Sequence, residues 1–350
     1  MDNPKISILI PLYNRKQYAA QCIDSALNQT FQEEYEILIR DDCSTDGVFE
    51  LVKEKYSSQI SIGKIKLSRN KKNVGEFATV NTSLKKANGK YIMILHNDDM
   101  YLPNALEHLY KVAEKTNADV VHASNFFVSS KGGIINNIQK DCKKYCPEKH
   151  TFDKVVIMPS DPTSRFNEWI SNGTFIDAQY NIFRKNLLLE TEFFANDYDN
   201  RYDALWWIMM AKVFVKTPVI HYVRRDSPDS QTNKNFPAEN FNKFISKKIE
   251  ILHDMDKRFS KMDFFRDNEY LQYMAKAHLL FELDNYEIER RQLYSDGITP
   301  EIYKSVADSF KKIFGNNYFY PMMLFNWVHV MPYNKSCCHI NFKATSSSKI

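Results

Sequence analysis

The stretch KYIMILHNDDMYLPNAL, residues 90–106, decides the fold, because an apolar run stops at HNDD and a helical pattern begins past Pro103. Asp98 and Asp99 are adjacent there. Two carboxylates at the end of a buried strand repel each other and lose hydration, so a lysine, a metal ion or water must offset their charge. The residues alone equally fit a second interpretation, in which both carboxylates favour the positive end of the following helix.

The same change of period recurs along residues 1–123. Apolar runs predict strands within 5–14 and at 35–40, 63–68, 90–95 and 118–124. Helical spacing predicts helices at 18–27, 76–87 and 103–116. Strands that are apolar nearly throughout and alternate with helices indicate a mostly parallel sheet with helices on both faces.

Three polar clusters follow the predicted strands, at residues 11–14, 41–46 and 96–99. In a parallel α/β sheet, ligands bind beyond the carboxyl ends of the strands. We therefore expect the three clusters to line one crevice. Within the second cluster, Asp41, Asp42 and Asp46 suit turn formation and helix capping as well as a carboxylate that accepts an N–H from a nucleobase.

The composition argues against several classes of protein. The chain has 350 residues, a formal net charge of +4 and no compact basic stripe, so nucleic-acid binding is not expected. No apolar run reaches about 18 residues, so no membrane-spanning helix is expected. The first residues lack the layout of a signal peptide, which makes a cytoplasmic protein the expectation. The six cysteines are too few and too poorly spaced for a disulfide framework.

As an ordered set, three segments resemble the inverting family 2 glycosyltransferases with the GT-A fold: SILIPLYNRKQYAAQCIDSALNQTF, EILIRDDCSTDG and NVGEFATVNTSLKKANGKYIMILHNDDMYLP. These motifs cover residues 5–125, and a weaker likeness continues to about residue 230. The resemblance implies a Rossmann-like nucleotide-binding mixed sheet flanked by helices, a UDP-sugar donor, and Mn²⁺ or Mg²⁺ held by a motif of the DxD type.

The resemblance also implies roles for residues of the donor half. Pro11 and Tyr13 would flank the base, Asp42 would accept the uracil N–H, and Asn73 would lie beside the nucleoside.

In the metal motif, Asp98 would contact the ribose or the metal, and Asp99 would be the principal metal ligand. Both supply the oxygen ligands that Mg²⁺ and Mn²⁺ prefer. The chain departs from the family twice: His96 replaces the first aspartate of D-x-D-D, and Val80 replaces a customary arginine.

Inversion needs a carboxylate that deprotonates the acceptor hydroxyl as it attacks the anomeric carbon. The segment NDYDNRYDALWWIMMAK places Asp203 at the start of a helix, where the family carries this base. Asp197 and Asp199 are neighbouring candidates, and core packing explains the tryptophans that follow Asp203 as well as a sugar contact does. Asp203 could also merely open this helix. We expect Trp206 to stack on the acceptor, and Asp177 either to orient the acceptor or only to act as a cap.

A second segment, PVIHYVRRDSPDSQT, resembles the family's loop near the diphosphate. There, Arg224 or Arg225 would neutralise the charge of the leaving group.

The expected organisation is a GT-A catalytic domain over residues 1–232, a helical C-terminal region over 233–345, and a disordered tail over 346–350. The catalytic domain divides into a nucleotide-sugar-binding half, 1–125, and an acceptor half, 126–232. For the C-terminal helices three roles stay open: packing onto the catalytic domain, self-association as a homo-oligomer, and peripheral contact with a membrane through lysines that flank apolar faces.

The expected function is transfer of a hexose or N-acetylhexosamine from a UDP-sugar to a glycan or lipid-linked saccharide, in surface polysaccharide or glycolipid assembly. The enzyme would act in the cytoplasm or at the inner face of the membrane. A nucleotidyltransferase is disfavoured because PLYNRK lacks the glycine of a phosphate-binding loop. The alternative is a catalytically impaired nucleotide-sugar-binding module or scaffold, which the two departures keep open.

Overall fold

The computed structural model describes residues 3–129, 135–137, 142–145, 155–172, 177–193, 200–226 and 241–279, with residues 304, 307, 308, 311 and 315. The chain groups into two compact units. The first comprises Met1–Phe166 and Thr174–Ser230, and the second comprises Asn167–Gly173 and Gln231–Ile350. The division of the chain at residue 232 stays a prediction, and the predicted tail lies outside the described residues.

The first unit is built on a large sheet with strand order β3-β2-β1-β4-β10-β6-β11-β9. The strands are β1 (Ile6–Leu12), β2 (Tyr35–Asp41), β3 (Ile65–Arg69), β4 (Tyr91–Ile94), β6 (Val120–Ala123), β9 (Val156–Ile157), β10 (Asn181–Arg184) and β11 (Phe214–Thr217). Strands β1 to β4 pair in parallel, as do β6 and β11. Strand β10 runs antiparallel between β4 and β6. The predicted mixed, mostly parallel sheet is confirmed.

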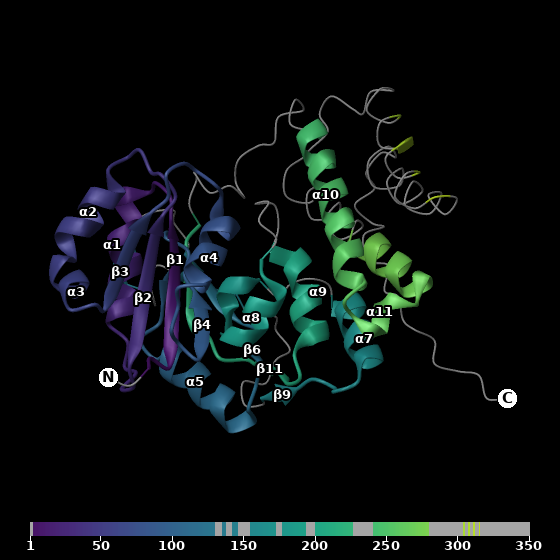
Figure 1. Cartoon of the computed structure of the whole chain (residues 1–350). Helices are drawn as coiled ribbons and strands as arrows, with labels where there is room; N and C mark the ends of the chain where they lie inside the picture. Colours follow the sequence, from purple (N-terminus) through teal and green to yellow (C-terminus); the bar gives the residue numbers. More distant parts are fainter. Residues whose placement is uncertain are drawn as a thin grey trace. The chain divides into compact units, whose positions relative to one another are not determined.

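Helices cover both faces of this sheet, as predicted. They are α1 (Lys16–Leu27), α2 (Val48–Lys55), α3 (Ser57–Ser61), α4 (Glu76–Leu84), α5 (Ala105–Thr116), α8 (Lys185–Thr191) and α9 (Asn200–Met210). The residues of a further helix, α7 (Pro162–Asn172), are divided between the two units. In Figure 1, α1, α2 and α3 lie on one side of β1–β3, and α4 lies on the other. Because β1, β2 and β4 run parallel, the loops that follow them open at one edge of the sheet.

A smaller sheet has the strand order β5-β12-β7-β8. Its strands are β5 (Met100–Tyr101), β7 (Phe126–Ser129), β8 (Cys142–Tyr145) and β12 (Tyr222–Arg224), and a short helix η1 (Ala178–Tyr180) precedes β10. Strand β5 follows the HNDD turn directly and pairs with β12. This pairing brings the predicted arginine segment to the predicted metal motif.

The core follows from the alternation of side chains along β1. Ile6, Ile8, Ile10 and Leu12 are fully buried on one face, in a cluster that includes Ala19, Cys22, Ile23 and Ala26 of α1. The spacing of these α1 residues matches the apolar face predicted for residues 18–27. This packing fixes α1 under the loops that follow the strands.

A separate polar network lies at the amino ends of the strands. Ser7 Oγ donates to Glu36 Oε1 at 2.6 Å, and Asn88 N donates to the same oxygen at 2.6 Å. Lys66 pairs with the other carboxylate oxygen. Gly89 N donates to Ser7 Oγ at 2.8 Å, and a Cβ at Gly89 would lie 2.4 Å from Ser7 N. Only glycine lets the two backbones approach this closely.

The second unit contains α10 (Phe241–Phe259) and α11 (Asp263–Arg266), and residues 269–279 are also helical. Leu252, Met255, Phe259 and Phe265 are buried in it. Within the described residues, every helix is too short or too polar to cross a bilayer.

Candidate active site

The loop after β1 carries two successive residues in the left-handed conformation, Asn14 at φ 53° and Arg15 at φ 62°. Asn14 N donates to Ser44 Oγ at 2.8 Å, and Thr45 N donates to Asn14 Oδ1 at 2.9 Å. The loops after β1 and β2 are therefore joined, as expected for polar clusters at one edge. Of the predicted base neighbours, Pro11 is buried within β1, whereas Tyr13 is 45% exposed.

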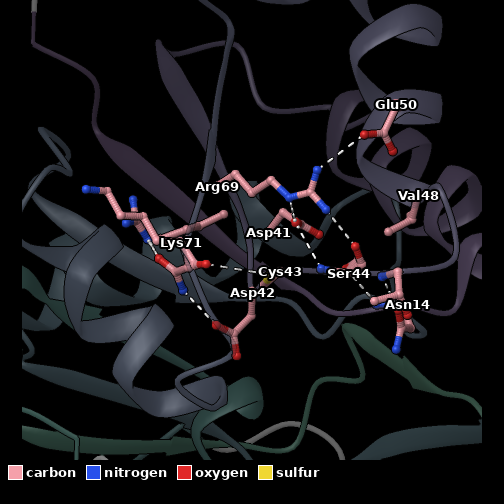
Figure 2. A network of polar contacts seen from close by, with 12 residues as sticks. Asn14, Asp41, Asp42, Cys43, Ser44, Val48, Glu50, Arg69 and Lys71 are labelled. Atoms are coloured by element: carbon pink, nitrogen blue, oxygen red, sulfur yellow. Dashed lines mark hydrogen bonds and ion pairs between the residues drawn. The ribbon is translucent and has the colours of Figure 1, made fainter.

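The loop after β2 is organised around Arg69, the last residue of β3 (Figure 2). Arg69 Nε lies 2.9 Å from Asp41 Oδ2, and Arg69 Nη2 donates to Ser44 O at 2.6 Å. Asp41 is fully buried, and its Oδ2 also accepts from Ser44 N at 3.1 Å. Cys43 occupies the left-handed region at φ 63°. Asp41 thus serves this turn, and it is Asp42 that faces α4.

Asp42 is 3% exposed and accepts three hydrogen bonds from the protein. Asn70 Nδ2 and Val74 N donate to its Oδ1 at 2.8 and 2.9 Å, and Gly75 N donates to its Oδ2 at 2.8 Å. These backbone amides lie just before α4, so Asp42 stabilises the start of that helix. One acceptor position remains on Oδ2, and contact of Asp42 with a nucleobase stays a prediction. The predicted Asn73 is exposed.

The HNDD turn is tied to the loop after β1. Arg15 forms an ion pair with Asp98, and Asn97 Nδ2 donates to Asn14 O at 3.0 Å. The structure thus brings Asp98 to the edge where the first two polar clusters meet. The charge of this carboxylate is therefore offset by an arginine, whereas the sequence suggested a lysine, a metal ion or water.

Asp99 is held by β12 through both carboxylate oxygens. Tyr222 Oη donates to Oδ2 at 2.7 Å, and Arg225 N donates to Oδ1 at 2.7 Å. Burial raises the pKa of Asp99, and His96 and these donors oppose the shift without cancelling it. Arg225 Nε donates to Asp98 O at 2.7 Å, so this buried arginine also fixes the turn.

His96, the first departure from the family, pairs with a glutamate. Its Nε2 lies 2.9 Å from Glu76 Oε1, at the start of α4, and its Nδ1 lies 3.9 Å from Asp99 Oδ2. Burial lowers the pKa of His96, but the carboxylates of Glu76, Asp99 and Asp177 outweigh it and raise the pKa to about 9. A cation therefore stands where the family has a carboxylate.

Arg224 and Asp177 belong to the same neighbourhood. Burial lowers the pKa of Arg224, but Tyr180, Asp99 and Asp177 raise it overall. The guanidinium also lies 5.9 Å from the ring centre of Phe126. The structure thus gathers Asp98, Asp99, Asp177, Arg224 and Arg225 from segments far apart in the sequence.

The predicted base and its neighbour lie on α9. Asp203 and Trp206 are both fully buried, and Trp206 meets Tyr202 edge to face at 5.7 Å between ring centres. Neither Asp203 nor Trp206 offers surface to solvent here, and their roles in transfer stay predictions. Asp197 and Asp199 lie outside the described residues.

The residues present fit a divalent cation by the chemistry of their ligands. Asp98 and Asp99 supply carboxylate oxygens, and Mg²⁺ or Mn²⁺ takes one or two such groups together with water and substrate phosphates. Within the described residues, no group of three or more histidines, cysteines and carboxylates could hold a metal by itself. The site therefore suits an ion that is shared with a ligand rather than one enclosed by protein.

The mostly parallel sheet, with β10 antiparallel between β4 and β6 and helices on both faces, is a mixed α/β fold of the GT-A class. Residues 7–188 match the family described as Glycosyl transferase family 2, and the chain belongs to this family. The predicted family and fold are thereby confirmed.

Individual comparisons agree with this assignment. An uncharacterized glycosyltransferase of Rickettsia bellii is 36% identical over 135 residues, 38% of this chain and 19% of that protein. Chondroitin synthase of Escherichia coli is 32% identical over 182 residues, 50% of this chain and 26% of that protein. The crystal structure of S. aureus TarS 1-349 with UDP-GlcNAc is 18% identical, with a TM-score of 0.59 over 88% of this chain and 81% of that one. The chain thus corresponds to about a quarter or less of these two sequence relatives.

Sequence reasoning missed several residues of the site, among them Arg15, Arg69, Asn70, Glu76 and Tyr222. Asn70 directly follows β3, so the rule that placed the other clusters at the strand ends could have found it. Glu76 and Tyr222 carry no such signal, because their roles depend on a helix start and a short strand that meet the HNDD turn only in the folded chain.

Proposed function

We propose that this protein is an inverting glycosyltransferase that moves a hexose or N-acetylhexosamine from a UDP-sugar to a saccharide acceptor. Membership of family 2 supports the reaction class. The name of the TarS complex with UDP-GlcNAc supports a UDP-sugar donor. The observation that carries the proposal is the gathering of Asp42, Asp98 and Asp99 at the carboxyl ends of β2 and β4.

In this proposal the donor lies over the loops after β1, β2 and β3. Tyr13, whose ring is exposed, stacks on the uracil with Pro11 beneath, and Asp42 accepts the N–H of the base. Asn73, exposed in the loop before α4, lies beside the nucleoside. Asp98 reaches the ribose or the metal.

Asp98 and Asp99 hold Mn²⁺ or Mg²⁺ together with the donor diphosphate. When bound, the ion supplies positive charge that stabilises the leaving diphosphate. Tyr222 and Arg225 orient Asp99. Because the guanidinium of Arg225 donates to Asp98 O and to Gln21 Oε1, Arg224 is the better candidate to neutralise the leaving group.

The acceptor lies on the other side of the anomeric carbon. Asp203 takes the proton of the attacking hydroxyl, so an α-linked donor gives a β-linked product. Asp177 orients the acceptor, and Trp206 packs near it. Asp203 has to become accessible from its buried position when the acceptor binds.

The acceptor itself is a glycan or a lipid-linked saccharide in this proposal, and the enzyme acts in the cytoplasm or at the inner face of the membrane. Support comes from the family resemblance alone. Sedimentation with vesicles that contain a lipid-linked saccharide tests this part, and retention of the protein in the supernatant contradicts membrane contact.

The second candidate function is binding of a nucleotide sugar without transfer. The His96–Glu76 pair favours it, because it places a cation beside Asp99 where a divalent ion would bind. Binding of a UDP-sugar without hydrolysis or transfer by the wild type would decide for this candidate.

Hydrolysis of UDP-hexoses and UDP-N-acetylhexosamines with Mn²⁺, measured by release of UDP, tests the proposed reaction. We expect hydrolysis of one sugar to dominate, and we expect Asp99→Ala to abolish it. Asp203→Asn should abolish transfer to an acceptor, and the exposed Glu33→Ala is the matched control. Full transfer by both Asp99→Ala and Asp203→Asn would overturn the mechanism.

A further inference from the structure

Asn70 lies directly after β3 and links β2, β3 and α4 through its side-chain amide. Its Oδ1 accepts from Arg40 Nε at 2.6 Å, and its Nδ2 donates to Asp42 Oδ1 at 2.8 Å and to Thr79 Oγ1 at 2.9 Å. Thr79 is fully buried, and Asp42 nearly so. The amide therefore uses its oxygen and both of its hydrogens inside the protein.

The orientation of this amide follows from the chemistry of its neighbours. A guanidinium only donates hydrogen bonds, and an ionised carboxylate only accepts them. With Arg40 on one side and Asp42 on the other, the amide oxygen must face Arg40 and the amino group must face Asp42. In a flipped amide, the amino group would face the donor Arg40 and the oxygen would face the acceptor Asp42, so neither hydrogen bond could form. Arg40 therefore determines which group Asn70 offers to Asp42.

Asn70 in turn determines which oxygen of Asp42 can serve a ligand. Each carboxylate oxygen has two lone pairs. Oδ1 receives Asn70 Nδ2 and Val74 N, which fill it, whereas Oδ2 receives Gly75 N alone. The acceptor position that remains free of these donors is on Oδ2.

We propose that Asn70 is a positioning residue for recognition of the nucleobase. By donating to Oδ1 of Asp42, Asn70 leaves Oδ2 to accept a hydrogen bond from the ring N–H of uracil. This rests on the proposed function, in which Asp42 contacts the base. Cytosine carries no hydrogen on the corresponding ring nitrogen, so a carboxylate fixed in this way rejects it. Without Asn70, Oδ1 would receive Val74 N alone and would offer an acceptor position of its own, so the carboxylate would no longer present a single oxygen and the preference for uracil falls.

Calorimetric titration of UDP and CDP into the wild type, Asn70→Ala and Thr79→Val, all in buffer with MnCl₂, tests the role of Asn70. We expect the wild type to prefer UDP, and Asn70→Ala to lose about tenfold in UDP affinity while its CDP affinity stays the same. Thr79→Val is the matched control, since it removes the other acceptor of the amide and leaves Asp42 untouched. It should keep the wild-type ratio of UDP to CDP affinity.

An unchanged ratio in Asn70→Ala, or equal weakening of both nucleotides, would overturn the role of Asn70. A wild type that does not prefer UDP to CDP would instead contradict the proposed function, so the two failures are distinguishable. If Asn70→Ala does not fold, Arg40→Met carries the test, because it removes the group that orients the amide, together with a hydrogen bond to Ser68 Oγ, and leaves Asn70 and Asp42 in place. We then expect the ratio to fall about threefold, and an unchanged ratio would count against the proposal.

Discussion

Two buried carboxylates at opposite ends of the sheet differ in what stabilises their charge: Glu36 near the amino end of β2, and Asp99 in the turn after β4. At the amino ends, burial raises the pKa of Glu36, but hydrogen bonds from Lys66, Ser7 and Asn88 outweigh it and leave the pKa lowered. At the carboxyl ends, burial dominates and raises the pKa of Asp99. The protein itself therefore stabilises the ionised form of Glu36, whereas the ionised form of Asp99 would gain from a cation bound nearby.

Backbone conformation repeats this contrast. Asn14, Arg15 and Cys43 adopt positive φ at the carboxyl ends. Such conformations cost free energy in residues other than glycine and gather at functional sites. The network at the amino ends therefore adds to the stability of the fold, whereas the strained residues at the carboxyl ends lower it to shape the site.

The largest effect on stability is expected from Gly89→Ala at the amino ends. The new Cβ would lie 2.4 Å from Ser7 N, so the backbone of β1 or of the turn must shift. We expect a loss of about 3 kcal/mol in the free energy of unfolding, measured with urea. The control is Gly63→Ala, where φ is +79° but nothing lies near the new Cβ, with an expected loss of about 1 kcal/mol. Equal losses would remove close approach as the reason for glycine.

Glu36→Gln and Asp99→Asn are expected to change the free energy of unfolding in opposite directions. Glu36→Gln loses charge-assisted hydrogen bonds and should cost about 2 kcal/mol at pH 7. Asp99→Asn removes a carboxylate whose ionised form burial disfavours, and should gain about 1 kcal/mol. Urea unfolding of both variants measures these two changes, and a lower free energy of unfolding in both would contradict the contrast between the ends.

The pH dependence of Glu36 has a definite sign. Because the folded pKa of Glu36 is lower than the unfolded value near 4.5, its stabilisation is present above that pH and is lost as pH falls through the folded pKa. The difference in stability between the wild type and Glu36→Gln should therefore shrink below about pH 4.5. A difference that stays constant down to pH 3 would contradict this account.

Tyr222→Phe tests how much the hydrogen bond from Tyr222 to Asp99 contributes to metal binding at the carboxyl ends. It removes the hydroxyl that donates to Asp99 Oδ2 and leaves the ring packed against Tyr101 and Tyr180. Outer-shell partners of metal ligands are worth tenfold or more in affinity, so Mn²⁺ binding with UDP should weaken about tenfold by calorimetry. Tyr110→Phe in α5 is the control, and an equal loss there would discount the hydroxyl of Tyr222.

The smallest effect is expected from Cys43→Gly. Glycine adopts φ near 63° without the clash of a Cβ, so the variant should gain about 0.5 kcal/mol, after the greater unfolded-state freedom of glycine is subtracted. Asn117→Gly is the control, since asparagine already tolerates the left-handed position after α5. Thermal unfolding measures both, and a destabilised Cys43→Gly would show that the thiol contributes more than its strain removes.

Much of the first unit was predictable because local signals agree with the fold there. The apolar runs that became β1, β2, β3, β4 and β6 ended in polar turns, and parallel strands necessarily bring those turns to one edge. The resemblance then supplied roles for the strand-end residues. The partners of Asp99 and His96 were not predictable, because Tyr222 and Glu76 reach them through tertiary contacts that leave no periodic trace.

Strand β10 was also missed, since NIFR is too short to carry a pattern and its two neighbours are distant in sequence. Its position has a consequence for how the chain is made. Among the described strands, β6 pairs only with β10 and β11, and β10 also pairs with one edge of β4. Both β4 and β6 therefore lack a neighbour until β10 has been made. A nascent chain that has not yet emerged from the ribosome past Asn181 holds two strands with bare edges. The first four strands can assemble early, but the sheet closes from its middle, and truncated products that end before this strand should aggregate rather than fold.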